Sequence, residues 1–204
     1  MAHLRRPLGA ALALNTVVFI VESVAGLKAN SLSLMMDAAH NLSDEVAILL
    51  LFLAYVMPSG LSGTLIWSAS FLNSLGILAL GGFLVCQAAA RLLHAEPVLG
   101  IIPIVAGLIA AVGNYGVAAV LRKAATSDPA IRLAYVHNLG DALVAMAPVA
   151  AGLLIVVTRL YLFDPLLALV VAGVLLSSTL RELAVSRKDL LWPRKVACGP
   201  HHSG

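Results

Sequence analysis

One five-residue pattern occurs twice in the chain, as HNLSD at residues 40–44 and as HNLGD at residues 137–141. In each copy the histidine and the aspartate stand four residues apart, so on a helix they lie one turn apart on the same face. Two such faces would supply two imidazoles and two carboxylates to one point. The repeat therefore predicts a metal site built from His40, Asp44, His137 and Asp141.

The ligand types narrow the choice of ion. Imidazole favours zinc, cobalt, nickel or copper over magnesium and calcium, and neither motif supplies the thiolate that Cu(I) prefers. Two aspartates and two neutral histidines suit a tetrahedral divalent cation and balance its charge. Zn²⁺ is the predicted ion, with cobalt, nickel, iron and cadmium as alternatives. Because metal must displace protons from these ligands, metal loading and proton release should be linked.

The segments that must position the two motifs are strongly apolar. Hydrophobic residues make up 61% of the 204 positions and charged residues 11%, and the mean hydropathy is +0.99. Such a composition excludes a disordered chain and predicts a membrane protein. Cys86 and Cys198 provide no disulfide framework.

Six runs are long enough to cross a bilayer, for which about 20 mostly apolar residues are needed. They lack a two-residue alternation, so helices are the structure that satisfies their backbone in lipid. The predicted fold is an all-α bundle of six transmembrane helices: Leu8–Leu27, Leu32–Val56, Leu65–Ala90, Gly100–Leu121, Ile131–Val157 and Asp164–Leu183.

Helical rise places both motifs near the membrane centre. Asp44 lies roughly 18 Å along from Leu32, and Asp141 roughly 15 Å along from Ile131, within a hydrocarbon core of about 30 Å. The second and fifth helices run in opposite directions, so each histidine should face the aspartate of the other helix. This arrangement has the form of an inverted repeat with its site at the midplane.

The basic residues fall mainly on one side of the six spans, which predicts that both termini are cytoplasmic. Topology and attraction to anionic lipid also explain the basic pI of about 9.1 without nucleic acid as a partner. The far side holds Lys28, Arg91 and Arg159. The near side holds Arg5, Arg6, Arg122, Lys123, Arg132, Arg181, Arg187, Lys188, Arg194 and Lys195.

In these features the chain resembles the transmembrane domain of the cation diffusion facilitators, a family of zinc transporters. The resemblance covers about residues 8–191 and includes both motifs together with Leu14-Asn15, Glu22, Asn30-Ser31-Leu32, Asp37, Asn73, Asn114 and Asp164-Pro165. It implies a tetrahedral site between the second and fifth helices, in its zinc-preferring form. It also implies export of Zn²⁺ from the cytoplasm in exchange for protons by alternating access.

The expected domain organisation is a transport domain at residues 1–190 and a short, disordered cytoplasmic tail at 191–204. The family usually carries a cytoplasmic domain after the sixth helix, which dimerises and regulates, and residues 191–204 are not expected to form one. A homodimer would therefore form through lipid-embedded surfaces, or the chain acts alone. His201 and His202 beside Cys198 are either a weak metal site or part of a solvated tail. A compact chain without a targeting segment indicates a bacterial inner membrane.

Several other polar residues stand within the spans. Asp37 either lines the ion path or caps the helix entrance, and Asn15 and Glu22 either line a cavity or bond to neighbouring helices. Glu45 points about 100° away from Asp44, so it should pair with another helix. Gly140 is expected to admit another backbone near the site. Pro148 should bend the fifth helix, either as a hinge or as a static kink.

Two rival functions remain open at this point. An intramembrane metalloenzyme would need an open coordination position, whereas four protein ligands close a tetrahedral site. A membrane scaffold would bind no metal. The predicted function is therefore a transporter, with no catalytic residues and no cofactor beyond Zn²⁺ as the transported substrate.

Overall fold

A computed structural model describes residues 2–56, 63–126 and 129–191. Over these residues the chain is helical and contains no strand, which confirms the all-α prediction. The elements are α1 Ala2–Ala29, α2 Leu32–Val56, α3 Gly63–Leu93, α4 Ile101–Leu121, the short 3₁₀ helix η1 Ala124–Thr126, α5 Pro129–Val144, α6 Met146–Thr158 and α7 Phe163–Leu191. The predicted tail from residue 192 onward lies outside the described residues.

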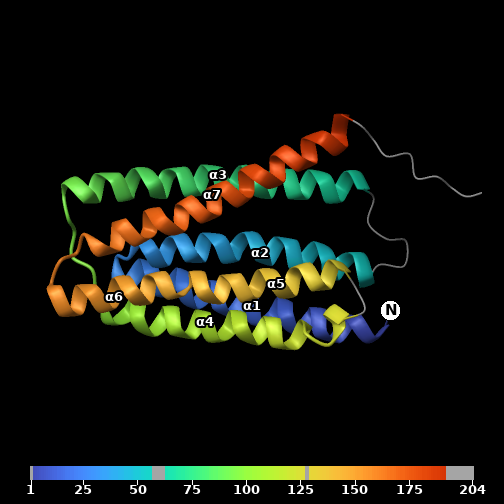
Figure 1. Cartoon of the computed structure of the whole chain (residues 1–204), viewed down its shortest axis with the longest axis horizontal. Coiled ribbons are helices and arrows are strands. Elements are labelled where there is room, and N and C mark those ends of the chain that lie inside the picture. Colours follow the sequence, from blue (N-terminus) through green and yellow to red (C-terminus); the bar gives the residue numbers. More distant parts are fainter. Residues whose placement is uncertain (1, 57–62, 127–128, 192–204) are drawn as a thin grey trace, which may run out of the picture.

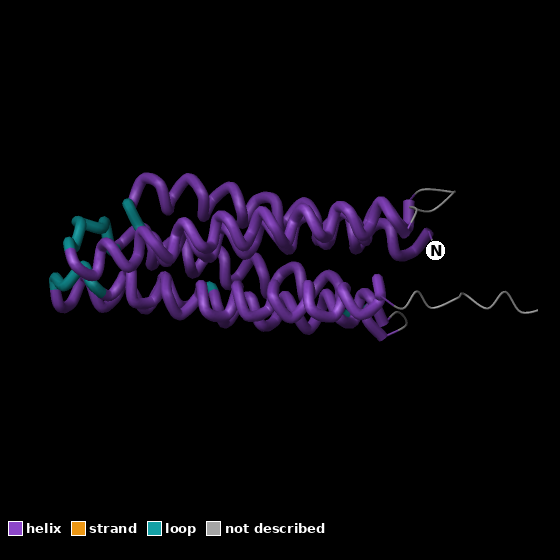
Figure 2. Tube along the Cα trace, turned by 90° about the horizontal axis from the view of Figure 1, so that it is seen from above, coloured by secondary structure: helices purple, strands orange, loops and turns teal. Residues whose placement is uncertain are grey.

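The long helices lie side by side along one axis, with the short connections at the ends of the bundle (Figures 1 and 2). α5 and α6 follow one another along a single crossing, so the chain crosses six times. The start of α1 and the end of α7 lie at the same end. The opposite end contains Lys28, Arg91 and Arg159, at the C-terminal ends of α1, α3 and α6. This arrangement agrees with the predicted charge asymmetry.

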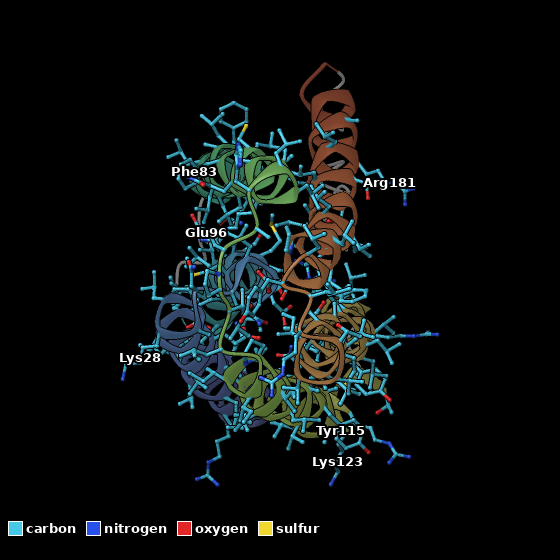
Figure 3. All side chains as sticks on the ribbon, turned by 90° about the vertical axis from the view of Figure 1, so that its left-hand side faces the viewer. Lys28, Phe83, Glu96, Tyr115, Lys123 and Arg181 are labelled. Carbon is cyan, nitrogen blue, oxygen red and sulfur yellow. The ribbon has the colours of Figure 1, made fainter. Side chains whose placement is uncertain are left out.

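The bundle has the surface of a protein that sits in lipid. Apolar side chains cover its perimeter, and Phe83 and Tyr115 point outward at 59% and 62% exposure (Figure 3). Among the described helices, five stretches are long and apolar enough to cross a bilayer: Arg6–Ala29, Phe71–Leu93, Ile101–Leu121, Ile131–Thr158 and Phe163–Arg181. The remaining crossing, α2, carries three acidic residues that face other helices. The chain is an integral, multi-pass membrane protein.

α2 lies between two apolar clusters and contributes to both. Its outer half packs Leu32, Met36 and Ala39 against α3 and α7. Nearer its cytoplasmic end, Ile48 packs against residues of α1, α4, η1 and α5. The polar stretch from His40 to Glu45 lies between these two apolar contacts, so burial of the flanking residues fixes its depth.

The fifth crossing is interrupted at Ala145, where α5 ends and α6 begins. Pro148 follows three residues later and has no N–H to offer the carbonyl of Val144, which accounts for the break. α6 then packs closely on α4 through glycine. A Cβ on Gly107 would lie 2.8 Å from a methyl carbon of Val149, and one on Gly152 would collide with the carbonyl oxygen of Gly100.

The outer end of α2 is capped by Ser31, whose hydroxyl oxygen accepts from the backbone N–H of Leu34, and by Asp164 of α7. The buried carboxylate of Asp164 accepts hydrogen bonds from the hydroxyls of Ser31 and Ser33, each at 2.6 Å. It also accepts from the backbone N–H groups of Leu32 and Ser33. These N–H groups have no partner within their own helix, so the carboxylate satisfies them and favours the positive end of the helix dipole.

Candidate metal centre

Two antiparallel helices bring the predicted residues together. His40 and Asp44 lie in the middle of α2, and His137 and Asp141 lie in the C-terminal half of α5. One nitrogen or oxygen atom from each of the four lies within 4.8 Å of all the others. Although neither motif is near the other in sequence, the topology places them opposite each other.

Each histidine pairs with the aspartate of the other helix, as the antiparallel arrangement predicts. His40 Nε2 lies 2.9 Å from an Asp141 carboxylate oxygen, and His137 Nε2 lies 2.7 Å from one of Asp44. Within each motif the histidine and aspartate are farther apart, at 3.7 Å and 3.9 Å. The two imidazole rings meet edge to face with their centroids 5.6 Å apart.

The donor set fits a tetrahedral divalent cation. An ionised carboxylate can only accept, so each histidine Nε2 carries the hydrogen of its bond in this arrangement. The second oxygens of Asp44 and Asp141 are buried and have no hydrogen-bond partner among the described residues. Metal–ligand distances of about 2.0–2.2 Å would place the four donors about 3.4 Å apart. To reach that spacing, the two cross-helix pairs, now 2.9 Å and 2.7 Å apart, would separate slightly while the more distant donors approach.

Access to the four residues is one-sided. The side chains of His40, Asp44 and Asp141 are 5–7% exposed, whereas that of His137 is 45% exposed. His137 lies one turn nearer than Asp141 to the N-terminal end of α5, the end predicted to face the cytoplasm. The expectation that Gly140 admits a neighbouring backbone is wrong, because a Cβ there would meet no atom within 4 Å. α5 has no close neighbour on that face, which leaves space beside the exposed histidine.

The backbones of α2 and α5 do not pack against each other. α5 packs on α4, and α2 packs chiefly on α1, α3 and α7. Side chains occupy the space between α2 and α5, as the end-on view shows (Figure 3). The four donors are therefore held at the tips of side chains that extend from two separately supported helices.

The three predicted path residues are not part of this group of four. Asn15 and Glu22 lie on the face of α1 that contacts α2, where Asn15 donates to the backbone oxygen of Asn41 and Glu22 accepts from the Asn41 amide. Asp37 is 1% exposed and faces Glu22. Asp37 does not cap α2, because Asp164 does so.

Glu45 pairs with another helix, as its angle from Asp44 predicts. Its carboxylate accepts from Asn15 at 3.0 Å and from the hydroxyl of Thr16, both on α1. The part played by Thr16 was not predicted from the sequence. The sequence signal for such a partner was Glu45 itself, because an ionisable residue within a membrane span needs a hydrogen-bond partner on a neighbouring helix.

Comparison with known proteins adds an independent observation. Residues 8–191 match the family model of the cation efflux transmembrane domain. The chain belongs to the cation efflux family. The match covers all six crossings and both motifs, in agreement with the resemblance seen in the sequence.

Individual relatives agree with the family assignment. The chain is 30% identical over 183 residues to the zinc transporter ZitB of Escherichia coli, and 28% identical over 193 residues to ZitB of Pectobacterium atrosepticum. These matches cover 84% and 89% of this chain. A cadmium, cobalt and zinc/H(+)-K(+) antiporter of Bacillus subtilis is 25% identical over 173 residues, or 80% of this chain.

The chain spans 56–60% of the length of these three relatives. All three are bacterial, which supports the predicted location in a bacterial inner membrane. Members of the cation efflux family are transporters, so the family assignment favours a transporter over an intramembrane enzyme.

Proposed function

We propose that this chain exports Zn²⁺ from the cytoplasm in exchange for protons, and that His40, Asp44, His137 and Asp141 bind the ion. One observation carries the proposal: four donors of the type that zinc prefers converge within 4.8 Å at mid-membrane depth. A polar network that only joined helices would not need two unpartnered carboxylate oxygens facing two imidazoles.

The hydrogen bonds within the site supply the proton coupling. When each histidine is an imidazolium paired with a carboxylate, it carries hydrogens on both Nδ1 and Nε2, so a Zn²⁺ ion that takes Nε2 of His40 and of His137 as ligands releases one proton from each ring to solvent. Return of protons to the same atoms restores the two histidine–aspartate bonds and removes the nitrogen ligands. Metal and protons therefore compete for one set of atoms, which is the requirement for exchange.

The one-sided exposure supports loading from the cytoplasm. The exposed member, His137, lies toward the cytoplasmic end, and the outer end of α2 is closed by Asp164 and the two serines that it binds. This arrangement corresponds to the inward-facing state of an alternating-access cycle. Separation of α7 from the outer end of α2 would be part of the opposite state.

The same machinery acting on another divalent ion is the second candidate. It is favoured by the relative whose name includes cadmium and cobalt together with zinc. Competition of these metals with zinc in one uptake assay separates the two candidates. A homodimer, if the chain forms one, would use the apolar perimeter on which Phe83 and Tyr115 lie exposed.

The test is Zn²⁺ uptake into proteoliposomes that contain the purified chain and hold a pH gradient. The wild-type chain should take up Zn²⁺, and Asp44→Ala should reduce uptake to the level of empty vesicles. Zn²⁺ affinity should fall at least about tenfold, since even a residue that only orients a ligand costs about 10–100-fold. Glu45→Gln is the matched control, because this neighbour of Asp44 bonds to α1 instead. Wild-type uptake by Asp44→Ala would refute the site.

A further inference from the structure

Beside the four candidate ligands, α1 and α2 bury a second pair of acidic residues. Glu22 of α1 is 0% exposed and Asp37 of α2 is 1% exposed, and their carboxyl groups face and interact with each other. Asp37 lies seven residues before Asp44, or about 10 Å toward the outside along α2. None of the hydrogen bonds of the described residues joins this pair to His40, Asp44, His137 or Asp141.

The pair has too few hydrogen-bond donors. The side-chain amide of Asn41 donates to one oxygen of Glu22. The other oxygen of Glu22 and both oxygens of Asp37 are buried without a partner in the described part of the chain. Burying carboxyl oxygens without hydrogen-bond donors costs free energy in a low-dielectric interior. No described side chain supplies a donor to these three oxygens.

The surrounding charges do not remove this cost. The ionisable groups that act most strongly on the pair are His40 and Asp44 of α2 and Asp141 of α5. Both aspartates repel a carboxylate, and His40 is already bonded to Asp141. Two ionised carboxylates side by side in such a place are strongly unfavourable, whereas two that share one proton carry a single negative charge between them and supply the missing donor.

We propose that Glu22 and Asp37 form a proton-binding site, separate from the metal ligands, in which one proton is shared between the two carboxyl groups. A proton suits the pair better than a metal ion, because the pair offers no imidazole or thiolate and is closed to solvent. If the chain exchanges Zn²⁺ for protons as proposed, this site would supply one of the exchanged protons. Its existence as a proton site does not depend on transport.

Infrared spectroscopy of the full chain in lipid vesicles tests the proposal, because a protonated carboxyl group has a C=O band distinct from that of a carboxylate. At neutral pH, without added metal, the wild-type chain should show this band. Labelling glutamate or aspartate with ¹³C at the side-chain carboxyl should shift part of it. The double variant Glu22→Gln with Asp37→Asn should lose the amplitude of one protonated carboxyl per chain.

Two further variants act as controls. Glu45→Gln should leave the band unchanged, because Glu45 has two hydrogen-bond donors from α1. His40→Ala, which disables the proposed metal site, should also retain it. The absence of the band from wild type, or its insensitivity to both labels, would overturn the proton site even where Zn²⁺ transport is intact. Failure of wild-type Zn²⁺ uptake with the band present would refute the proposed function alone.

Discussion

Two consecutive carboxylates on α2 show how a single helical step separates two roles. Asp44 points to His137 on α5, and Glu45 points to Asn15 and Thr16 on α1. The angle of about 100° between successive residues accounts for the difference. One residue can then supply a proposed ligand while its neighbour bonds to a different helix.

Acid should weaken metal binding, because Zn²⁺ and hydrogen compete for Nε2 of His40 and His137. Below the pH at which the metal-free histidines lose their protons, the apparent Kd should rise by about tenfold per pH unit for each proton displaced. Isothermal titration calorimetry in buffers of different ionisation enthalpy would measure both the affinity and the number of protons released. An affinity that does not change with pH would contradict competition at these atoms.

The four candidate ligands could be predicted because each pair lies within five consecutive residues of the sequence. A spacing of four residues defines a helical face, and the count of crossings defines the relative direction of the two faces. The cap formed by Asp164 could not be predicted in this way, since the residue lies 131–133 positions from the serines that it binds. Sequence spacing does not tell which helix end lies opposite another.

At the scale of elements, the cap predicts that α2 depends on α7 for its outer end. Asp164→Asn would place an amide N–H₂ where donors already converge, and should lower the free energy of unfolding by about 1–3 kcal/mol. Thermal unfolding of the purified chain in detergent would measure the change. Glu96→Gln is the control, because its partner Arg91 forms a surface pair worth less than about 1 kcal/mol. Equal unfolding midpoints for the two variants would argue against the cap.

Close packing of α6 on α4 predicts that replacing glycine by alanine changes the free energy of unfolding differently at Gly152 and at Gly82, which lies on α3 outside this contact. Gly152→Ala should destabilise the chain by about 1–3 kcal/mol, because the new methyl group would collide with the carbonyl oxygen of Gly100 and press on Ile104. Gly82→Ala on α3 meets no atom within 4 Å and should be neutral or stabilising by up to about 1 kcal/mol. The same unfolding assay compares the two, and a smaller loss for Gly152→Ala than for Gly82→Ala would be incompatible with close helix packing.

Helix bounds were predictable where polar residues interrupt apolar runs, and less so elsewhere. α2 has the predicted bounds, Leu32–Val56, whereas α7 continues from the predicted Leu183 to Leu191. A helix can continue into polar residues outside the hydrocarbon core, and hydropathy does not predict where such a helix ends. The bend at Pro148 was expected, but the break lies at Ala145, because the lost hydrogen bond belongs to the preceding turn.

At the scale of the whole molecule, the charge distribution predicts which end faces the cytoplasm. Lys28 and Lys123 are exposed. Lys28 lies in the last turn of α1 and Lys123 lies just beyond the end of α4, and these two helix ends lie at opposite ends of the bundle (Figure 1). In a chain whose two native cysteines are replaced by serine, Lys28→Cys should react with a membrane-impermeant thiol reagent added outside cells. Lys123→Cys should react only after the membrane is opened. The reverse pattern would invert the proposed direction of transport.

The separation of the α2 and α5 backbones has a mechanical consequence. A divalent cation bound by the four side chains would draw α2 and α5 together at the level of the site, where their backbones do not pack on each other. Occupied and vacant carriers would then differ in width at the midplane. Either Zn²⁺ or the protons that restore the two histidine–aspartate bonds would join the helices, so a carrier that holds neither would not dissipate the ion gradient that drives it.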